Sequence, residues 1–458
     1  MRILFILPPS KFAIKDTVGI PGMPLGLAYL ASVLDEEGHE VKIIDAPTLN
    51  YDWENLRKEI KGFKPDIVGI TSTTSTIYDA YKVAKLVKEY NSKIKVVIGG
   101  SHVSFTPEET LKECSSIDIV VRGEGEEAMK ELANSFEMGL PLEEIRGITF
   151  RDDEKILQTE NRPFIENLDE LPFPAYSLLP MDKYRVGKKQ FANIITSRGC
   201  PFSCIFCSSS QLCGKRWRAR SPENVIKELE MLEEEYNIQE VEVLDDTFTL
   251  NNKRAEKICD LIIKKGLDIS WSASSRVNTI TQQLAYKMRS AGCHILYFGI
   301  ESGSQKILNI IQKGITLSQS EKAVQIAKRA GINTLGTFII GIPGETKETI
   351  KKTIKFVKKL NPALAQFTIC TPYPGTKLFK IAKEKHLLLT KDWSKYTILH
   401  PVMKTPGIVS KKLRRWLIRV YLSFYLRPRF IMKQIKKRDL FIVKKAFKAA
   451  LNYLKGQR

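Results

Sequence analysis

Short apolar runs alternate with amphipathic stretches over the first 121 residues of the chain. The runs are apolar without interruption, which is typical of parallel strands covered on both faces, and between them apolar residues recur at intervals of three and four, as in helices. The pattern predicts strands at 2–7, 40–45, 66–71, 95–98 and 117–121, and helices at 25–37, 53–61 and 77–90. We therefore expect an α/β fold with a doubly wound parallel sheet over residues 1–140.

Polar residues and glycines follow several of these strands. Thr71 ends the third strand, Gly99 and Gly100 follow the fourth, and Glu124 comes after the fifth. The carboxyl ends of parallel strands meet at one edge of a sheet, where such folds bind ligands, and glycine lets the backbone approach a bulky ligand closely. The sequence therefore predicts a ligand site at that edge, with these four residues in it.

The rest of the chain divides into three parts. Residues 141–190 form a predicted connector with a small hairpin and a proline-rich, apolar segment. Strands and helices alternate again over 191–395, with predicted strand ends at Thr196, Leu244, Ala273, Ile300, Ile340 and Ile369. Six such units predict a partial β/α barrel whose active face lies at the carboxyl ends of the strands. Residues 396–458 then form a basic helical tail.

Three cysteines, Cys200, Cys204 and Cys207, lie on the loop after the first strand of this barrel. Three thiolates can hold three irons of a cubane cluster, which leaves the fourth iron open to bind a small molecule. A structural zinc site usually needs four ligands, commonly as two close pairs, and no second CxxC or HxxxH follows here. A closed electron-transfer cluster, with Cys213 as the fourth ligand, stays open as an alternative.

The spacing of the three cysteines, with Phe206 just before the third, resembles the signature of the radical S-adenosylmethionine (SAM) enzymes. The resemblance implies a [4Fe-4S] cluster whose open iron binds the amino and carboxylate groups of SAM. Reduction by a ferredoxin or flavodoxin then cleaves SAM and gives a 5'-deoxyadenosyl radical. The resemblance also implies SAM contacts at later strand ends: Asp245 for the methionine amine, Glu301 for the ribose, Ile342 for the adenine and Arg276 for the carboxylate.

The order of the two domains narrows the resemblance. A doubly wound domain directly before a radical SAM triplet resembles the Rossmann-like cobalamin (B12)-binding domain of the subfamily that includes Mg-protoporphyrin cyclase, hopanoid methylases and archaeal tetraether-lipid ring synthases. This implies cobalamin as a further cofactor. The DxHxxG motif that often supplies an axial histidine is missing, and residues 1–150 hold only His39 and His102. We expect cobalamin without a protein ligand, and the alternative is an inherited fold that no longer binds it.

Positive charge is concentrated at the end of the chain. The 458 residues carry a net charge of +21, and residues 401–458 hold 17 Lys and Arg against one acid, Asp439. The apolar run at 416–426 is too short to span a bilayer, and over 440–454 apolar residues recur at three and four among basic ones. We expect a cytoplasmic protein whose tail lies on the inner face of the membrane, and the alternative is helices packed on the barrel.

Two further features bear on the partners. The tRNA methylthiotransferases of this superfamily carry three more cysteines in the N-terminal domain, whereas here that domain holds only Cys114, so a nucleic-acid partner is disfavoured. Arg216, Trp217 and Arg218 follow the cysteine loop. Their guanidinium groups either hold acidic groups of the substrate or form ion pairs between the two domains.

The resemblance implies that the chain functionalises an unactivated carbon, by C-methylation or by formation of a carbon–carbon bond. The expected substrate is a membrane lipid or another large apolar molecule, and a tetrapyrrole or a natural product is the alternative. A non-catalytic iron–sulfur redox or sensor protein at the membrane is the alternative from another class. Methylation and cyclisation begin with the same radical, so the sequence does not separate them.

Overall fold

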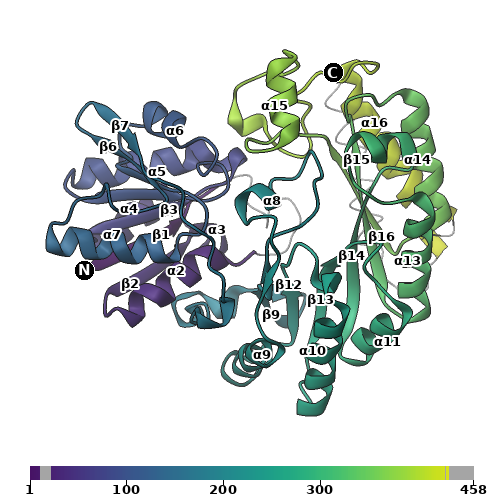
Figure 1. Ribbon diagram of the computed structural model, residues 1–458, viewed down its shortest axis with the longest axis horizontal. Helices are drawn as coiled ribbons and strands as arrows, with labels where there is room; N and C mark the ends of the chain where they lie inside the picture. The colour runs from purple at the N-terminus through teal and green to yellow at the C-terminus, as the bar shows by residue number, and fades with distance from the viewer. Residues whose placement is uncertain (11–21, 429, 433–458) are drawn as a thin grey trace.

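The protein is described by a computed structural model that covers residues 1–10, 22–428 and 430–432. The amphipathic helix predicted at 440–454 therefore lies outside the described residues. Two α/β bodies lie side by side (Figure 1): the N-terminal body is drawn in purple and blue, and the second body in teal and green.

A seven-stranded sheet in the order β2-β1-β3-β4-β5-β6-β7 forms the N-terminal body. Ile3 and Phe5 of β1 pack in the core under α2 and α7, while Leu4 packs in the core under α4 and α5, so both faces of the sheet are covered and the predicted doubly wound sheet is confirmed. Its parallel strands are β1 (Arg2–Leu7), β2 (Glu40–Asp45), β3 (Ile67–Thr71), β4 (Lys95–Gly99) and β5 (Ile119–Val121), and its helices are α2 (Leu25–Glu36), α3 (Ala46–Leu49), α4 (Trp53–Phe63), α5 (Ile77–Tyr90), α6 (Pro107–Glu113) and α7 (Glu126–Met138).

The predicted hairpin belongs to this sheet. Strand β6 (Ile148–Asp152) pairs antiparallel with β5, and β7 (Lys155–Gln158) pairs antiparallel with β6. The pairing satisfies the backbone groups at the edge of β5, which would otherwise be left open. By its hydrogen bonds the N-terminal sheet therefore continues to Gln158, so the hairpin of the predicted connector 141–190 pairs with this sheet.

The rest of the connector packs between the two bodies through buried tyrosines. Tyr184 donates a hydrogen bond to Asp45 at the end of β2 (2.7 Å), and Tyr176 donates to Glu228 of the second body (2.9 Å). Both rings are at most 1% exposed. Buried phenol groups with satisfied hydroxyls fix the path of this irregular segment, because an unpaired buried hydroxyl is costly.

The second body is an open, half-barrel sheet in the order β16-β15-β14-β13-β12-β9-β8, in which β9 to β16 run parallel. The six predicted strand–helix units are confirmed. The strands are β8 (Arg185–Val186), β9 (Lys189–Ile194), β12 (Glu240–Val243), β13 (Ser270–Ser275), β14 (Cys293–Glu301), β15 (Asn333–Ile340) and β16 (Leu364–Ile369), and the helices are α9 (Pro222–Tyr236), α10 (Asn252–Lys265), α11 (Gln282–Ser290), α12 (Gln305–Ile310), α13 (Leu317–Arg329), α14 (Lys347–Leu360) and α15 (Lys377–Glu384).

Helix α16 (Ser410–Tyr425) covers the open edge of the half-barrel. The hydroxyl of Tyr421 accepts from the N–H of Phe367 (3.1 Å) and donates to its carbonyl (3.0 Å). One helical turn later, the hydroxyl of Tyr425 does the same with Ala365, at 3.0 and 2.7 Å. Residues 410–425 thus follow the packed-helix alternative, and none of the described helices is long and apolar enough to cross a bilayer.

We expect Tyr421→Phe and Tyr425→Phe each to lower the free energy of unfolding by about 1–2 kcal/mol, because each change leaves an N–H and a C=O of the edge strand without their partner. Urea unfolding followed by circular dichroism measures the effect. Tyr286→Phe is the matched control, since Tyr286 is half exposed on α11. Equal stability of all three variants would show that solvent replaces the tyrosine hydroxyls without cost.

Candidate functional site

The three signature cysteines lie on a loop that the protein holds by backbone hydrogen bonds. This loop, residues 199–207, follows the short strand β10 (Ser197–Arg198). The N–H of Cys200 donates to the carbonyl of Gly214 (3.1 Å), and the N–H of Ile205 donates to that of Ile311 (3.1 Å). Gly199 has φ +89°, and a Cβ there would stand 2.3 Å from the carbonyl oxygen of Arg216, so only glycine fits.

The donor set of this loop suits an iron–sulfur cluster. All three thiols are half-buried and free of disulfides. Burial raises the pKa of Cys200 and of Cys207, so thiolates here need a positive partner such as a metal centre. Among the described residues, no three His, Cys, Asp or Glu side chains are placed to hold one metal ion. Separate sulfurs on one loop fit a cubane, where each thiolate ligates a different iron.

Cys213 belongs to a different part of the site. It follows the short helix α8 (Ser209–Leu212) and lines a cavity that the three signature cysteines do not line. Burial raises the pKa of its thiol to about 11, as burial also raises the pKa of Cys200 and Cys207. Its position in the wall of that cavity sets Cys213 apart from the three signature cysteines.

The two adjacent acids after β12 have different environments. Both oxygens of Asp245 are taken by the turn after β9, because Thr196 and Ser197 each donate a backbone N–H and a hydroxyl to it, at 2.6–3.0 Å. Asp246 lines the cavity instead. The side chain of Asp246 is exposed to solvent, and partial desolvation raises its pKa. Besides burial, the charge of Asp246 raises the pKa of Cys200 and of Cys207.

Glu301, at the end of β14, forms a buried ion pair. Its carboxylate accepts from the ammonium group of Lys313 at 2.7 Å, and both side chains are less than 10% exposed. Glu301 has a positive φ of 65°, and a Cβ at Gly299 would stand 2.6 Å from atoms of both partners. The pair therefore depends on glycine at 299. Lys313 could not be predicted as the partner of Glu301, since a lysine twelve positions after a strand end has no fixed spacing to it.

The loop after β15 carries the predicted Ile342. Ile342 is fully buried, and the N–H of Gly341 donates to Glu345 at 2.5 Å. Burial raises the pKa of Glu345 to about 8. Thr405, beyond α15, donates to the carbonyl of Gly341 at 2.7 Å, so the backbone of this loop is fixed from both sides.

Arg276 follows β13 and points toward the cysteine loop. One terminal nitrogen donates to the sulfur of Cys204 at 3.7 Å, and the guanidinium carbon stands 3.5 Å from the ring centroid of Phe202. Lys313 stands 5.8 Å from the ring centroid of Phe206 on the same loop. The structure thus brings Arg276, Phe206 and the cysteines together.

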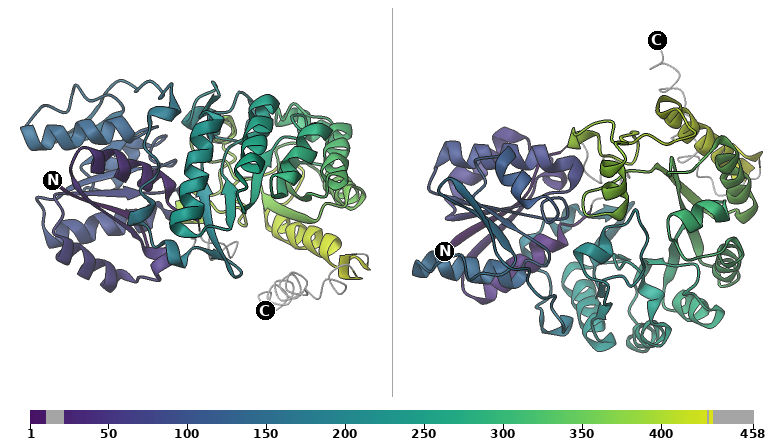
Figure 2. Two further views of the ribbon diagram at one scale, coloured as in Figure 1. Left: turned by 90° about the horizontal axis from the view of Figure 1, so that it is seen from below. Right: turned by 45° about the horizontal axis from the view of Figure 1, so that its top comes forward.

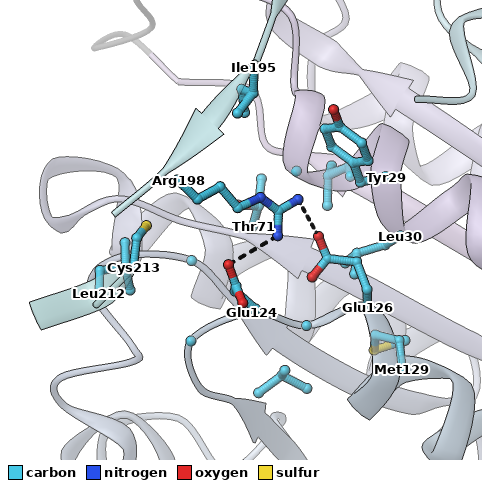
Figure 3. Close-up of a pocket in the computed structure, with 18 of the residues that line it drawn as sticks. Tyr29, Leu30, Thr71, Glu124, Glu126, Met129, Ile195, Arg198, Leu212 and Cys213 are labelled. Carbon is cyan, nitrogen blue, oxygen red and sulfur yellow. Dashed lines mark hydrogen bonds and ion pairs between the residues drawn. The ribbon is translucent and has the colours of Figure 1, made fainter. Parts of the chain in front are cut away.

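A cavity with a volume of about 410 Å³ lies between the two bodies and is bounded by the carboxyl ends of both sheets. The predicted residues Thr71, Gly99, Gly100 and Glu124 all line it. From the barrel side it is lined by Ile195, Arg198, Leu212 and Cys213 (Figure 3), and also by Leu244. The predicted edge of the first sheet is therefore one wall of an interdomain cavity.

Several glycines line this cavity. At Gly26 and Gly123, nothing stands within 4 Å of where a Cβ would be, and at Gly100 a Cβ would stand 2.3 Å from the carbonyl oxygen of Ser72. A mostly apolar space with bare backbone on one side fits a flat macrocycle with a bulky tail. His102 is buried against Trp393 (ring centroids 5.0 Å apart), and His39 lies beside the N-terminus and Glu137, so neither lines the cavity.

Ion pairs connect the two bodies at the rim of the cavity. Arg198 donates to Glu124 (3.2 Å) and to Glu126 (2.7 Å), as Figure 3 shows. Arg218, from β11 (Arg218–Ala219), donates to both oxygens of Glu124 at 2.9 Å. Arg216 pairs with Glu166 on the surface. The basic segment after the cysteines was expected either to bind acidic groups of the substrate or to form ion pairs between the domains. The described contacts of Arg218 are interdomain ion pairs.

A second contact between the bodies lies at the segment around α15 (Figure 2). Trp393 packs on His102 and stands 4.8 Å from Tyr396, centroid to centroid. Desolvation lowers the pKa of His102 to about 4, so its ring is neutral. A Cβ at Gly375 would stand 2.4 Å from the ring of Phe105, so this contact leaves no free space.

Comparison with known proteins agrees with this arrangement. The B12 binding domain model matches residues 13–133, and the radical SAM superfamily model matches residues 194–357. The chain is 53% identical to an uncharacterized methyltransferase of Pyrococcus horikoshii over 98% of both chains. It is 32% identical to the anaerobic magnesium-protoporphyrin IX monomethyl ester cyclase of Rubrivivax gelatinosus, over 95% of this chain and 80% of that relative.

Two solved structures share the fold. The chain aligns with a structure of TsrM from Kitasatospora setae, a radical SAM methyltransferase with cobalamin and [4Fe-4S] cluster bound, with a TM-score of 0.72 and 21% identity over 84% of this chain and 78% of that chain. It aligns with the cobalamin-dependent radical SAM enzyme OxsB with a TM-score of 0.79 and 18% identity, over 99% of this chain and 71% of that chain.

The relatives that show the family are enzymes, so the non-catalytic redox or sensor alternative is set aside. Both predicted domains are matched in the predicted order. The chain belongs to the radical SAM enzymes that carry an N-terminal B12-binding domain, the family of the methyltransferases and of the magnesium-protoporphyrin cyclase.

Proposed function

We propose that this protein holds a [4Fe-4S] cluster on Cys200, Cys204 and Cys207, cleaves SAM, and methylates or cyclises an unactivated carbon of a large substrate with cobalamin bound in the interdomain cavity. The observation that carries the proposal is that the interdomain cavity and the cysteine loop lie next to each other. The residue that connects them is Arg198, which lines the cavity and lies two positions before Cys200. A cofactor in the cavity and SAM at the cluster would therefore meet across a short distance.

When bound, the cluster supplies an electron to SAM, and cobalamin supplies a methyl carrier. The residues of the chain bind, orient and exclude water. Asp246 is the better candidate to accept from the ammonium group of SAM, because both oxygens of Asp245 are already taken. The ion pair of Glu301 with Lys313 and the fixed loop 341–345 support the ribose and adenine roles that the resemblance gave to Glu301 and Ile342.

For the substrate, a membrane lipid is supported by the basic C-terminal segment, since a polybasic, partly amphipathic segment binds anionic lipid surfaces. The chain is also 26% identical to the hopanoid C-3 methylase of Methylococcus capsulatus. On this proposal the protein acts in the cytoplasm at the inner membrane face and receives electrons from a ferredoxin or flavodoxin. Retention on anionic vesicles by the full chain, and its loss on truncation after residue 432, tests the membrane part.

A tetrapyrrole substrate is favoured by a different observation. Half-buried polar side chains alternate with fully buried apolar ones along the barrel strands, and they pair across strands in register: Ser274 with Tyr297, and Thr337 with Gln366. Tyr297 already donates to Ser272, and Thr337 to the carbonyl of Phe298. The carboxylate arms of a tetrapyrrole would add partners for Ser274 and Gln366, which a saturated lipid chain does not offer. Product analysis after incubation with each substrate class separates the two candidates.

We expect Cys200→Ala, Cys204→Ala and Cys207→Ala each to lose bound iron and to reduce SAM cleavage under dithionite to background, because a site with two thiolates does not hold a stable cubane. Iron analysis and chromatography of 5'-deoxyadenosine measure both effects. Cys213→Ala is the matched control and keeps iron and cleavage. Loss of iron in the control alone would mean that the cluster is held by a different set of cysteines.

We expect Asp246→Asn to weaken SAM binding about tenfold to hundredfold with the cluster intact, since a charge-assisted hydrogen bond contributes about 1.5–3 kcal/mol. Equilibrium binding of SAM to the oxidised protein measures it. Asp245→Asn instead lowers the thermal stability, because it disturbs the turn at Thr196 and Ser197. The opposite assignment, with SAM affinity lost in Asp245→Asn at unchanged stability, would restore Asp245 as the amine ligand.

We expect Gly26→Phe to abolish cobalamin retention while iron content and SAM cleavage persist. Gly26 lines the cavity and no atom stands near its Cβ position, so a phenyl ring fills the cavity without strain. Cobalt analysis after desalting, with the visible spectrum, measures retention. Gly26→Ala is the control with a small side chain. Full retention of cobalamin by Gly26→Phe, or no retention by the unchanged chain, would contradict the cobalamin part of the proposal.

A further inference from the structure

The guanidinium group of Arg276 has every nitrogen engaged by the protein. Its two terminal nitrogens donate to the sulfur of Cys204 (3.7 Å) and to the carbonyl of Lys313, and Nε donates to Asn278 (3.4 Å). The ring of Phe202 covers one face at 3.5 Å. These contacts use three of the five guanidinium N–H groups, one on each nitrogen, so the protein itself directs every nitrogen of Arg276.

The charge of Arg276 lacks an acidic partner in the protein. The residue is only 6% exposed, and within the described ranges of the chain no carboxylate forms an ion pair with it. Lys313, the other buried cation at this loop, is neutralised by Glu301 at 2.7 Å. A buried cation without a counter-charge is costly, so its place in the fold points to an anion that the protein itself does not supply.

The anion that fits is the cluster. Three thiolates on a four-iron core give the group a net negative charge, and reduction by one electron adds another. Hydrogen bonds to cluster sulfurs and nearby positive charge both favour the reduced state, which raises the reduction potential. Arg276 offers both, because it donates to the sulfur of one ligand and stacks on a ring two residues before it.

We propose that Arg276 is a positioning residue for the cluster: it donates to the Cys204 sulfur and raises the reduction potential of the [4Fe-4S] centre, instead of binding the carboxylate of SAM. The inference rests on the proposed function, since it requires the cluster. The step that it favours is a one-electron reduction of the cluster by a low-potential iron–sulfur or flavin protein, with no bond formed or broken.

The test is a potentiometric titration of the reconstituted full-length protein without SAM, followed by electron paramagnetic resonance. For Arg276→Gln we expect the ratio of reduced to oxidised cluster at a fixed potential to fall about tenfold, which for one electron is a shift of about 59 mV to lower potential. Arg276→Lys keeps the charge and shifts less. Arg329→Gln, on the exposed end of α13, makes the same change of net charge away from the loop and leaves the potential unchanged.

An unchanged reduction potential in Arg276→Gln overturns the inference. If SAM affinity is lost in the same variant, Arg276 is a SAM ligand. Should Arg276→Gln fail to assemble the cluster, Phe202→Leu replaces it. This variant loosens the guanidinium group without removing its charge, and a smaller downward shift is expected, while no shift counts against the inference. Absence of iron in the unchanged chain is a failure of the proposed function, and is seen before any potential is measured.

Discussion

The structure depends on one buried group of charges, in which Arg198 and Arg218 from the barrel meet Glu124 and Glu126 from the N-terminal domain. Taking four charges out of water is costly, and the cost is offset only when each group has well-placed partners. Here Glu124 has two arginines and Arg198 has two glutamates. A shift of one domain against the other would leave charges buried and unpaired, so the arrangement selects one relative position of the two sheet edges.

That position fixes the distance between the cavity and the cysteine loop. Arg198 ends β10, and Gly199 follows it in a conformation that only glycine adopts without strain. The loop therefore starts from a point that the interdomain ion pairs hold. On the opposite side of the interface, Trp393 closes on His102, and the ring of Phe105 fills the space at Gly375. Two contacts, one polar and one aromatic, therefore hold the two domains together.

The sequence was sufficient for the parts of the fold that follow from period and burial. Continuous apolar runs identified the parallel strands, and the cysteine spacing identified the loop. It was not sufficient where contacts between residues far apart in the sequence determine the role of a segment or side chain. The hairpin at 148–158 reads as an isolated pair, and only its pairing with β5 assigns it to the sheet. Adjacent acids at 245 and 246 look equivalent, yet strand alternation turns one into the protein and the other into the cavity.

The sequence of the C-terminal tail was also insufficient to decide what its helix packs against. The apolar run at 416–426 lies within the basic tail, and from the sequence alone such a tail is compatible with a membrane surface and with packing on the barrel. What decides is the pair Tyr421 and Tyr425, whose hydroxyls meet the backbone of an edge strand far away in sequence. The same reasoning separates Arg276 from the other strand-end residues. A motif gives the position of a functional group, but the contacts of that group decide how it can act, and each nitrogen of Arg276 already donates to the protein.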